Sequence, residues 1–171
     1  MNLLVKRARS GDKEAFVQLM EESKLSLLAA ARAILKDEED VADAMQETVL
    51  TAFQKLCTLR EEKYFKTWLI RILINHCYTI LRRRKTVPLS DFLPEESKEN
   101  NWDDILDVRT ALEETSAGDR LVLTLFYVED MSQREIGRVL GISENAVKQR
   151  LARGRSHFKS IYCRAVSYTH L

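Results

Sequence analysis

The chain has 171 residues, which is enough for one ordinary domain or two small ones. Charged residues make up 31% and hydrophobic residues 45%, a balance typical of a folded chain. Only five glycines and two prolines interrupt it, which disfavours β-sandwiches and barrels and predicts long helices. No apolar run reaches the roughly 18 residues of a membrane span, and no charged-then-apolar leader opens the chain, so we expect a cytoplasmic protein without membrane insertion.

Apolar residues recur at helical spacing through the first half of the chain. A start signal at residues 10–12 precedes two apolar stretches between residues 15 and 35. A clearer amphipathic helix is predicted over residues 40–56. Its apolar face comprises Val41, Ala44, Met45, Thr48, Val49, Ala52, Phe53 and Leu56. After a polar break, one long helix is predicted over residues 65–85.

The second half begins with a polar segment that contains both prolines. Residues 88–107 carry one basic and seven acidic side chains, whereas the segments before and after have net charges of +4 and +3. We therefore expect a flexible acidic linker between two mildly basic blocks. Further helices are predicted at residues 107–115, 119–128, 132–140 and 143–164. The run from Leu121 to Val128 also fits a strand, but its helical neighbours favour a helix.

The segment from Ser132 to Phe158 has the pattern of a helix-turn-helix. Ser132 and Glu135 match a capping box, and Gly141 occupies the turn, a position suited to positive φ. The second helix presents polar and basic side chains at Ser143, Glu144, Asn145, Lys148, Gln149, Arg150, Arg153 and Arg155. Groups near the start of such a helix reach base edges in the major groove, and those further along meet phosphates. A helical hairpin with a charged outer face is the alternative.

The long helix at residues 65–85 combines two features of single-strand binding. Aromatic residues gather at its start, and a basic run lies at its end. These residues are Tyr64, Phe65, Trp68, Arg82, Arg83, Arg84 and Lys85. Aromatic rings stack on unpaired bases, and basic groups follow the phosphate backbone. Periodicity alone also fits a purely structural role for Phe65 and Trp68.

Three stretches, taken in order, resemble the extracytoplasmic-function (ECF) group of the sigma-70 family of RNA polymerase sigma factors. DEEDVADAMQETVLTAFQKL resembles the polymerase-binding helix of this family, and YFKTWLIRILINHCYTILRRRK resembles its promoter-melting and minus-ten segment. LVLTLFYVEDMSQREIGRVLGISENAVKQRLARGR resembles its minus-thirty-five-binding domain. The resemblance implies an all-α fold of two small helical domains, tethered but separate, joined by a flexible acidic linker. The boundaries would be 1–87 for the region 2 bundle, 88–106 for the linker, 107–164 for the region 4 helix-turn-helix, and 165–171 for a tail that is disordered or foreign to the fold.

The resemblance also implies an alternative sigma factor, which directs bacterial RNA polymerase to specific promoters and assists DNA melting in transcription initiation. Such a subunit carries no catalytic site and needs no cofactor. Its partners would be core RNA polymerase, through the clamp of the largest subunit and the flap of the second largest, and promoter DNA, both as duplex and as melted non-template strand. An anti-sigma factor would hold it inactive and can retain it at the inner face of the membrane.

The family's contact positions fall on three sets of residues. The polymerase-binding set is Asp43, Gln46 and Glu47, which share one helix face. The minus-ten set is Arg60, Lys63, Tyr64, Phe65, Trp68, Asn75, Arg82, Arg83, Arg84 and Lys85. The minus-thirty-five set is Ser143, Glu144, Asn145, Lys148, Gln149, Arg150, Arg153 and Arg155. One position departs from the family, which often has Asp where this chain has Thr79.

Two other classes of protein remain open from the residues themselves. One is a stand-alone helix-turn-helix transcription regulator, which would bind duplex DNA by itself as a dimer. The other is an enzyme, which would need a cluster of histidine, cysteine or carboxylate side chains. The histidines and cysteines are instead scattered, so we expect no metal site and reduced, mostly buried thiols. They are His76, His157, His170, Cys57, Cys77 and Cys163.

Overall fold

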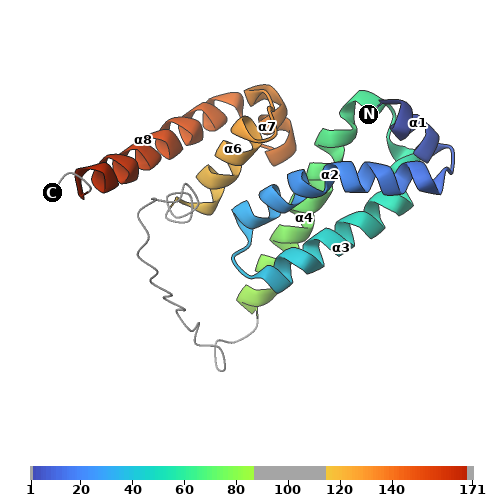
Figure 1. The fold of residues 1–171 in the computed structure, drawn as a ribbon, viewed down its shortest axis with the longest axis horizontal. Coiled ribbons are helices and arrows are strands. Elements are labelled where there is room, and N and C mark those ends of the chain that lie inside the picture. Colours follow the sequence, from blue (N-terminus) through green and yellow to red (C-terminus); the bar gives the residue numbers. More distant parts are fainter. Residues whose placement is uncertain (1, 87–114, 169–171) are drawn as a thin grey trace.

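The computed structural model describes residues 2–86 and 115–168, all of whose regular elements are helical (Figure 1). The N-terminal part contains α1 (Asn2–Arg9), α2 (Lys13–Ile34), α3 (Glu38–Lys55) and α4 (Phe65–Thr86), with the 3-10 turns η1 (Leu56–Thr58) and η2 (Glu62–Tyr64) between α3 and α4. The C-terminal part contains α6 (Ala117–Tyr127), α7 (Gln133–Leu140) and α8 (Glu144–Tyr168). These elements confirm the predicted all-α fold of two helical domains. The predicted linker and, apart from Thr115, the helix predicted at residues 107–115 lie outside the described residues.

The N-terminal helices form one bundle. Asp12 caps α2 by accepting a hydrogen bond from the Ala15 amide at 3.0 Å, and Asp37 caps α3 by accepting from the Glu39 amide at 2.8 Å. Helices α2, α3 and α4 pack against one another, and α1 packs on α2. Their facing side chains include the fully buried Leu19, Leu27, Phe65, Leu69 and Leu73. The sequence predicted α3 and α4 closely, but it divided α2 into two stretches and did not predict α1.

The helix-turn-helix forms as its local signals predict. Ser132 and Glu135 make the capping box at the start of α7, and Gly141 ends that helix with a φ of 66°. Gly137 allows the turn to approach closely, because a Cβ there would lie 2.9 Å from the Ile142 carbonyl oxygen. Ser143 accepts a hydrogen bond from the Ala146 amide at 3.1 Å and so caps α8.

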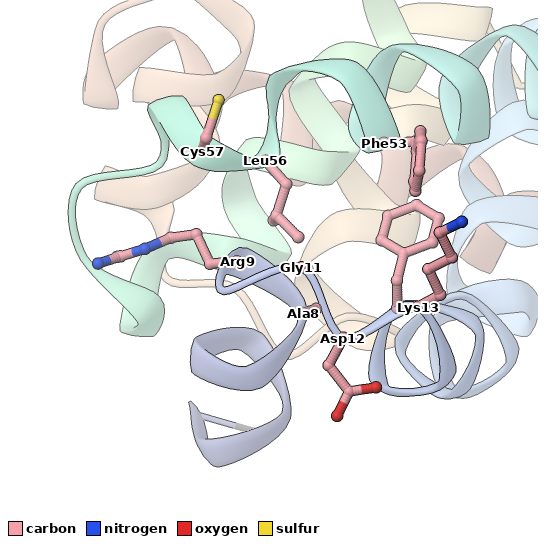
Figure 2. Close-up of a pocket in the computed structure, with 9 residues that line it drawn as sticks. Ala8, Arg9, Gly11, Asp12, Lys13, Phe53, Leu56 and Cys57 are labelled. Carbon is pink, nitrogen blue, oxygen red and sulfur yellow. The ribbon is translucent and has the colours of Figure 1, made fainter.

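Two expectations about single residues are wrong. Phe53, assigned to the core, is 56% exposed, and Cys57 is exposed rather than buried. Both line a pocket of about 280 Å³ between α1, the start of α2 and the end of α3 (Figure 2). Helix α8 continues through Tyr168, four residues into the segment expected to be a tail. Cys77 is buried as expected, and burial raises the pKa of its thiol to about 12.

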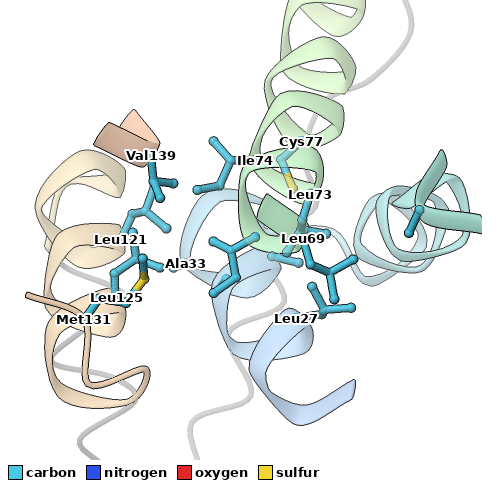
Figure 3. Packing of buried hydrophobic residues seen from close by; sticks show 14 of the residues in the cluster. Leu27, Ala33, Leu69, Leu73, Ile74, Cys77, Leu121, Leu125, Met131 and Val139 are labelled. Atoms are coloured by element: carbon cyan, nitrogen blue, oxygen red, sulfur yellow. The ribbon is translucent and has the colours of Figure 1, made fainter. Parts of the chain in front are cut away.

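The two domains pack against each other. Helix α6 lies against α2, and α7 lies against α4. Figure 3 shows the side chains that meet there, with Ala33 of α2 and Ile74 of α4 facing Leu121 of α6 and Val139 of α7. All four are at most 5% exposed, and they belong to one continuous apolar cluster that includes both domains. The expectation of separate domains is therefore wrong for this structure.

Polar groups fix the same interface. Arg120 of α6 is 7% exposed, and its Nε donates to the Ala33 carbonyl oxygen at 2.8 Å. That carbonyl lies in the last turn of α2, where the helix itself leaves acceptors without a donor. Glu129, whose side chain is 2% exposed, accepts a hydrogen bond from Ser26 of α2 and pairs with Lys66 of α4 at 3.1 Å. The Lys66 ammonium also donates to the Glu129 carbonyl oxygen at 2.8 Å, so one residue joins the C-terminal domain to two helices of the bundle.

Replacing Glu129 with Gln should loosen this interface. The change keeps the size of the side chain but removes the charge that holds Lys66 and Ser26, at an expected cost of about 1–3 kcal/mol to domain closure. We expect the radius of gyration measured by small-angle X-ray scattering to increase, because the domains separate while each stays folded.

Asp130→Asn is the matched control for this variant. Asp130 is the exposed neighbour of Glu129 and has a φ of 52°, a conformation that asparagine tolerates. The control removes the same charge, and its radius of gyration should equal that of the wild type. An equal value for Glu129→Gln would show that closure does not depend on this ion pair.

Candidate polymerase and nucleic-acid interfaces

The predicted polymerase-binding residues share the exposed face of α3. Asp43, Gln46 and Glu47 are all exposed, and the buried residues of the helix lie on its other side. Two apolar side chains extend this face, since Leu50 and Phe53 are each 56% exposed. An apolar centre beside polar groups is typical of a protein–protein interface. Sequence reasoning missed Leu50, although its spacing of three residues from Glu47 was the available signal.

A second exposed stripe runs along α4. It consists of Arg71, Asn75, Tyr78 and Arg82, which follow one another at spacings of four, three and four residues and are all exposed. A pocket of about 430 Å³ on this stripe is lined by Asn75, Tyr78, Leu81 and Arg82. The sequence predicted Asn75 and Arg82 as DNA contacts but missed Arg71 and Tyr78, whose helical spacing from Asn75 would have identified them.

Thr79 lies beside this stripe and turns back onto the helix. Its hydroxyl donates to the Asn75 carbonyl oxygen at 2.8 Å and accepts from Arg82 at 3.3 Å. The residue therefore makes local hydrogen bonds at a position where the family often places a carboxylate.

Two members of the predicted minus-ten set have structural roles. Phe65 is 1% exposed, because it faces the bundle together with Leu69 and Leu73, and its ring lies 6.1 Å from that of the half-buried Trp68. Arg84 pairs with Asp40 at 2.8 Å and with Asp37 at 3.3 Å, so it ties the end of α4 to the start of α3. Hydrogen bonds from the Glu39 amide and from Arg84 hold the pKa of Asp37 below its ordinary value.

The other basic residues of the set differ in their surroundings. Arg83 is exposed near the end of α4, and the side chain of Lys85 lies outside the described residues. Arg60, Lys63 and Tyr64 are exposed in the loop before α4. The Lys63 ammonium pairs with Glu61 at 2.7 Å and lies 4.8 Å from the centre of the Tyr64 ring, so charge and aromatic surface occur together there.

The first two turns of α8 present an exposed polar face. Glu144, Asn145, Lys148 and Gln149 are all exposed, whereas Val147 and Leu151 on the other side are buried. Lys148 lies 3.8 Å from Glu144 in a weak pair on the same face. Asparagine, glutamine and lysine at the start of a helix are the groups that read base edges in the major groove.

Three arginines of the predicted minus-thirty-five set turn toward α6. Arg153 pairs through two nitrogens with Asp119, at 2.9 and 3.2 Å. Arg155 lies 5.6 Å from the ring centres of Phe126 and Tyr127. Arg150 is half-buried, and a Cβ at Gly118 would lie 3.2 Å from its Nη1. Arg153 and Arg155 remain exposed, as their spacing predicted, but spacing does not show that α6 supplies their partners.

Within residues 2–86 and 115–168, no helix is long and apolar enough to cross a membrane. Among the side chains that the structure describes, no three histidine, cysteine or carboxylate groups gather closely enough to hold a metal ion. His76 instead lies 3.0 Å from the Thr51 hydroxyl and links α4 to α3.

A helix-turn-helix with an exposed reading face, next to a helical bundle, defines a DNA-binding protein. The family descriptions "Sigma-70 region 2" and "Sigma-70, region 4" match residues 19–87 and 105–158. The ECF RNA polymerase sigma factor SigM of Mycobacterium tuberculosis is 31% identical over 150 residues, which cover 86% of this chain and 76% of SigM. The RNA polymerase sigma factor CnrH of Cupriavidus metallidurans is 28% identical over 177 residues, which cover 93% of this chain and 92% of CnrH.

A solved structure agrees with these relatives. CnrH in complex with the cytosolic domain of CnrY aligns with a TM-score of 0.68 at 27% identity, and the alignment covers 95% of this chain and 97% of CnrH. The chain therefore belongs to the sigma-70 family, as an ECF RNA polymerase sigma factor, which confirms the family prediction. Its function is that of an alternative sigma factor in transcription initiation.

The Asp119–Arg153 pair predicts a dependence of stability on pH. Burial alone would raise the pKa of Asp119, but hydrogen bonds from Arg153 and Ser116 and the charge of Arg150 lower it below the ordinary 3.8. A lowered pKa contributes stability at pH values above 3.8, and that contribution is lost as the pH falls through the lower folded-state value. We expect Asp119→Asn to lower the stability by about 1 kcal/mol at neutral pH and to approach the wild type near pH 2. Thermal unfolding across this range measures the effect.

Glu144→Gln is the control for this pair. It disrupts the exposed contact with Lys148, which has no comparable burial, so it should leave the melting temperature nearly unchanged. If the difference in stability between Asp119→Asn and the wild type is the same at every pH, the ionised Asp119 carboxylate is not the source of the stability.

Proposed function

We propose that this sigma factor recognises promoters through two DNA-reading surfaces, one on each domain. The observation that supports the proposal is the exposed stripe on α4 together with the exposed face at the start of α8. We assign residues 1–87 to region 2, residues 88–106 to the linker and the chain from residue 107 to region 4. In this role the protein needs no cofactor and no catalytic site, because it supplies recognition to an enzyme that makes RNA.

The minus-thirty-five element would be read by the first two turns of α8. Asn145, Lys148 and Gln149 are exposed at the positions from which a recognition helix reaches base edges. Ser143, which caps α8, and Glu144, the first residue of α8, would contact the same promoter element. Arg150, Arg153 and Arg155, which contact or approach α6, would then act at the edge of the site, through phosphates or by supporting α8 against α6.

The minus-ten element would be bound by the loop before α4 and by the α4 stripe. Extruding a base from the duplex costs a few kcal/mol, which contacts with the loop residues Arg60, Lys63 and Tyr64 would offset. The half-buried Trp68 and the buried Phe65 would pack beneath that surface and hold it in place. Asn75, Arg82, Arg83 and Lys85 would follow the adjacent DNA, and we add Arg71 and Tyr78 to this set because they share the stripe.

Core RNA polymerase would bind the α3 face. Asp43, Gln46 and Glu47 supply exposed polar contacts for the clamp of the largest subunit, and Leu50 supplies apolar area next to them. This face lies apart from the helices that join the two domains, so polymerase could engage it before the domains separate.

Promoter binding would require the domains to separate. The two promoter elements lie roughly 25 base pairs apart, which is about 85 Å of duplex at about 3.4 Å per base pair. Domains that pack α6 on α2 and α7 on α4 cannot span that distance. Separation would expose the apolar face of α6, and we assign the flap of the second-largest subunit as the partner that covers it.

An anti-sigma factor would favour the closed arrangement. The related CnrH has been solved in complex with the cytosolic domain of CnrY, and the similarity to CnrH covers both domains of this chain. A partner that binds the closed arrangement more tightly than the open one shifts the equilibrium toward the closed arrangement. We therefore propose that this chain is held inactive by an anti-sigma protein, which can retain it at the inner face of the membrane.

A stand-alone regulator is the alternative function. It would bind its duplex site without polymerase, whereas a sigma factor that reads its promoter from both domains should show little specific binding alone. A gel-shift assay with and without core polymerase separates the two.

Transcription in vitro tests the proposal directly. The purified chain with bacterial core polymerase should start RNA synthesis at discrete sites, and Gln46→Ala with Glu47→Ala should lower both this activity and co-purification with core by about tenfold. Glu21→Ala with Glu22→Ala is the control, since it removes two exposed acidic groups from α2 instead of α3. Failure of the wild-type chain to start transcription with any core polymerase and genomic template from its relatives would falsify the proposed function.

Gln149→Ala tests the reading face of α8. It should lower transcription from promoters with the preferred upstream element and reduce discrimination against altered elements by about 1–3 kcal/mol. Arg150→Ala is the comparison, because this half-buried side chain should affect all upstream sequences alike. The assignment is wrong if Gln149→Ala weakens every promoter to the same extent.

A further inference from the structure

The loop between η1 and η2 is held from behind by a single arginine of α1. The Arg9 Nη1 donates to the carbonyl oxygen of Leu59 at 3.1 Å and to that of Arg60 at 3.3 Å. The same nitrogen lies 3.1 Å from a carboxylate oxygen of Glu62. One guanidinium therefore contacts three residues that lie on both sides of the loop's centre. Figure 2 shows Arg9 extending from the end of α1 toward the loop that follows Cys57.

Helix α1, which carries Arg9, is itself fixed in the bundle. Val5 is fully buried and Ala8 is 8% exposed, so the helix is anchored in the bundle through its packing on α2. Arg7 ties its end to Asp12, the cap of α2, at 2.7 Å. The region 2 match begins at residue 19 and so does not include α1 or Arg9.

The contact determines which way the loop presents its side chains. Since the carbonyl groups of Leu59 and Arg60 both point to Arg9, the backbone cannot turn them toward DNA. The side chains of Arg60, Glu61 and Lys63 are exposed, and Leu59 is buried at 6%. All three contacts are made by Nη1, so the positive charge and the two N–H groups of one nitrogen hold two backbone carbonyls and one carboxylate.

We propose that Arg9 is a positioning residue for minus-ten selection: it fixes the loop at residues 59–63 in the conformation that reads the promoter. This inference rests on the proposed role of the loop. A loop that is ordered before binding loses less entropy when DNA binds, and a rigid pocket discriminates better between the correct base and a wrong one. Without Arg9 the loop would adapt to several bases, so the main effect falls on selectivity rather than on overall activity.

The test compares promoter variants in transcription with core polymerase. Arg9→Ala should reduce the preference for the cognate minus-ten sequence over single-base variants by about fivefold. Sensitivity to changes in the upstream element and binding to core polymerase should stay as in the wild type. Arg9→Lys should keep part of the preference, because it retains the charge and three N–H donors on one nitrogen. Glu62→Gln, which keeps both carbonyl contacts, should lose less than Arg9→Ala.

Arg7→Ala is the matched control in the same helix. It removes an arginine and an ion pair two residues away but leaves the loop contacts intact, so it should keep the minus-ten preference. Equal losses in Arg7→Ala and Arg9→Ala, or an equal decrease on all promoters in Arg9→Ala, would mean that α1 acts only through stability. Thermal unfolding of each variant shows whether it folds, and Glu62→Gln tests the same contact from the loop side if Arg9→Ala does not fold.

Direct loop variants separate this inference from the proposed function. Arg60→Ala and Lys63→Ala should alter minus-ten preference if the loop reads DNA. If they do and Arg9→Ala does not, the positioning role is wrong while the proposed function stands. If neither loop variant has an effect, the loop is not the reader and the proposed function itself needs revision.

Discussion

Burial of α6 on two opposite sides is the constraint on which the closed structure depends. All seven residues from Asp119 to Leu125 are buried, because α2 covers one side of the helix and α8 covers the other. Single cores below roughly 70–80 residues supply only a few kcal/mol, so a domain of this size gains stability from further apolar contacts. The bundle supplies such contacts to the helix-turn-helix domain, and Arg120 joins the two by donating to the last turn of α2.

The same burial explains what could be predicted from the sequence and what could not. The helix-turn-helix was predictable because its signals are local, namely the capping box at Ser132, the positive φ at Gly141 and the cap at Ser143. The run LVLTLFYV was ambiguous because a helix that is buried all round loses the periodicity that distinguishes it from a strand. That uniform apolarity was itself a sign of a second packing partner.

The remaining errors arise where tertiary contacts decide. Helix α1 has eight residues and only Val5 and Ala8 are buried, so its periodic signal is too short to detect. Phe65 and Tyr64 are neighbours in sequence, yet one is 1% and the other 41% exposed, because Tyr64 ends the 3-10 turn η2 and Phe65 begins α4, so that their side chains point in different directions. Spacing identified the α3 face and the start of α8 correctly as exposed surfaces. It could not show that Arg84 and Arg153 are held by acids from other helices.

Several arginines have a structural use in this protein. Arg9, Arg84, Arg120 and Arg153 each contact a carboxylate or carbonyl on another element, which reduces the charge that remains for phosphate contacts. The whole chain has a net charge of only +1. Because phosphate contacts dominate the affinity of DNA-binding proteins, each domain alone should bind DNA weakly at physiological salt.

Each domain alone should bind DNA weakly, and the two domains pack against each other. Both features favour an order in which polymerase binds before promoter DNA. If the closed state is favoured by about 100 to 1, opening costs about 2.7 kcal/mol, which a few phosphate contacts at physiological salt scarcely offset. Polymerase can offset it, because two docking sites on one body make the second contact effectively intramolecular once the first has formed. In the proposed function the exposed α3 face is available in the closed state, so polymerase would bind there first and then capture α6 when the domains part. Promoter DNA would then meet two reading surfaces already held apart, and specificity would arise from their spacing as well as from their contacts.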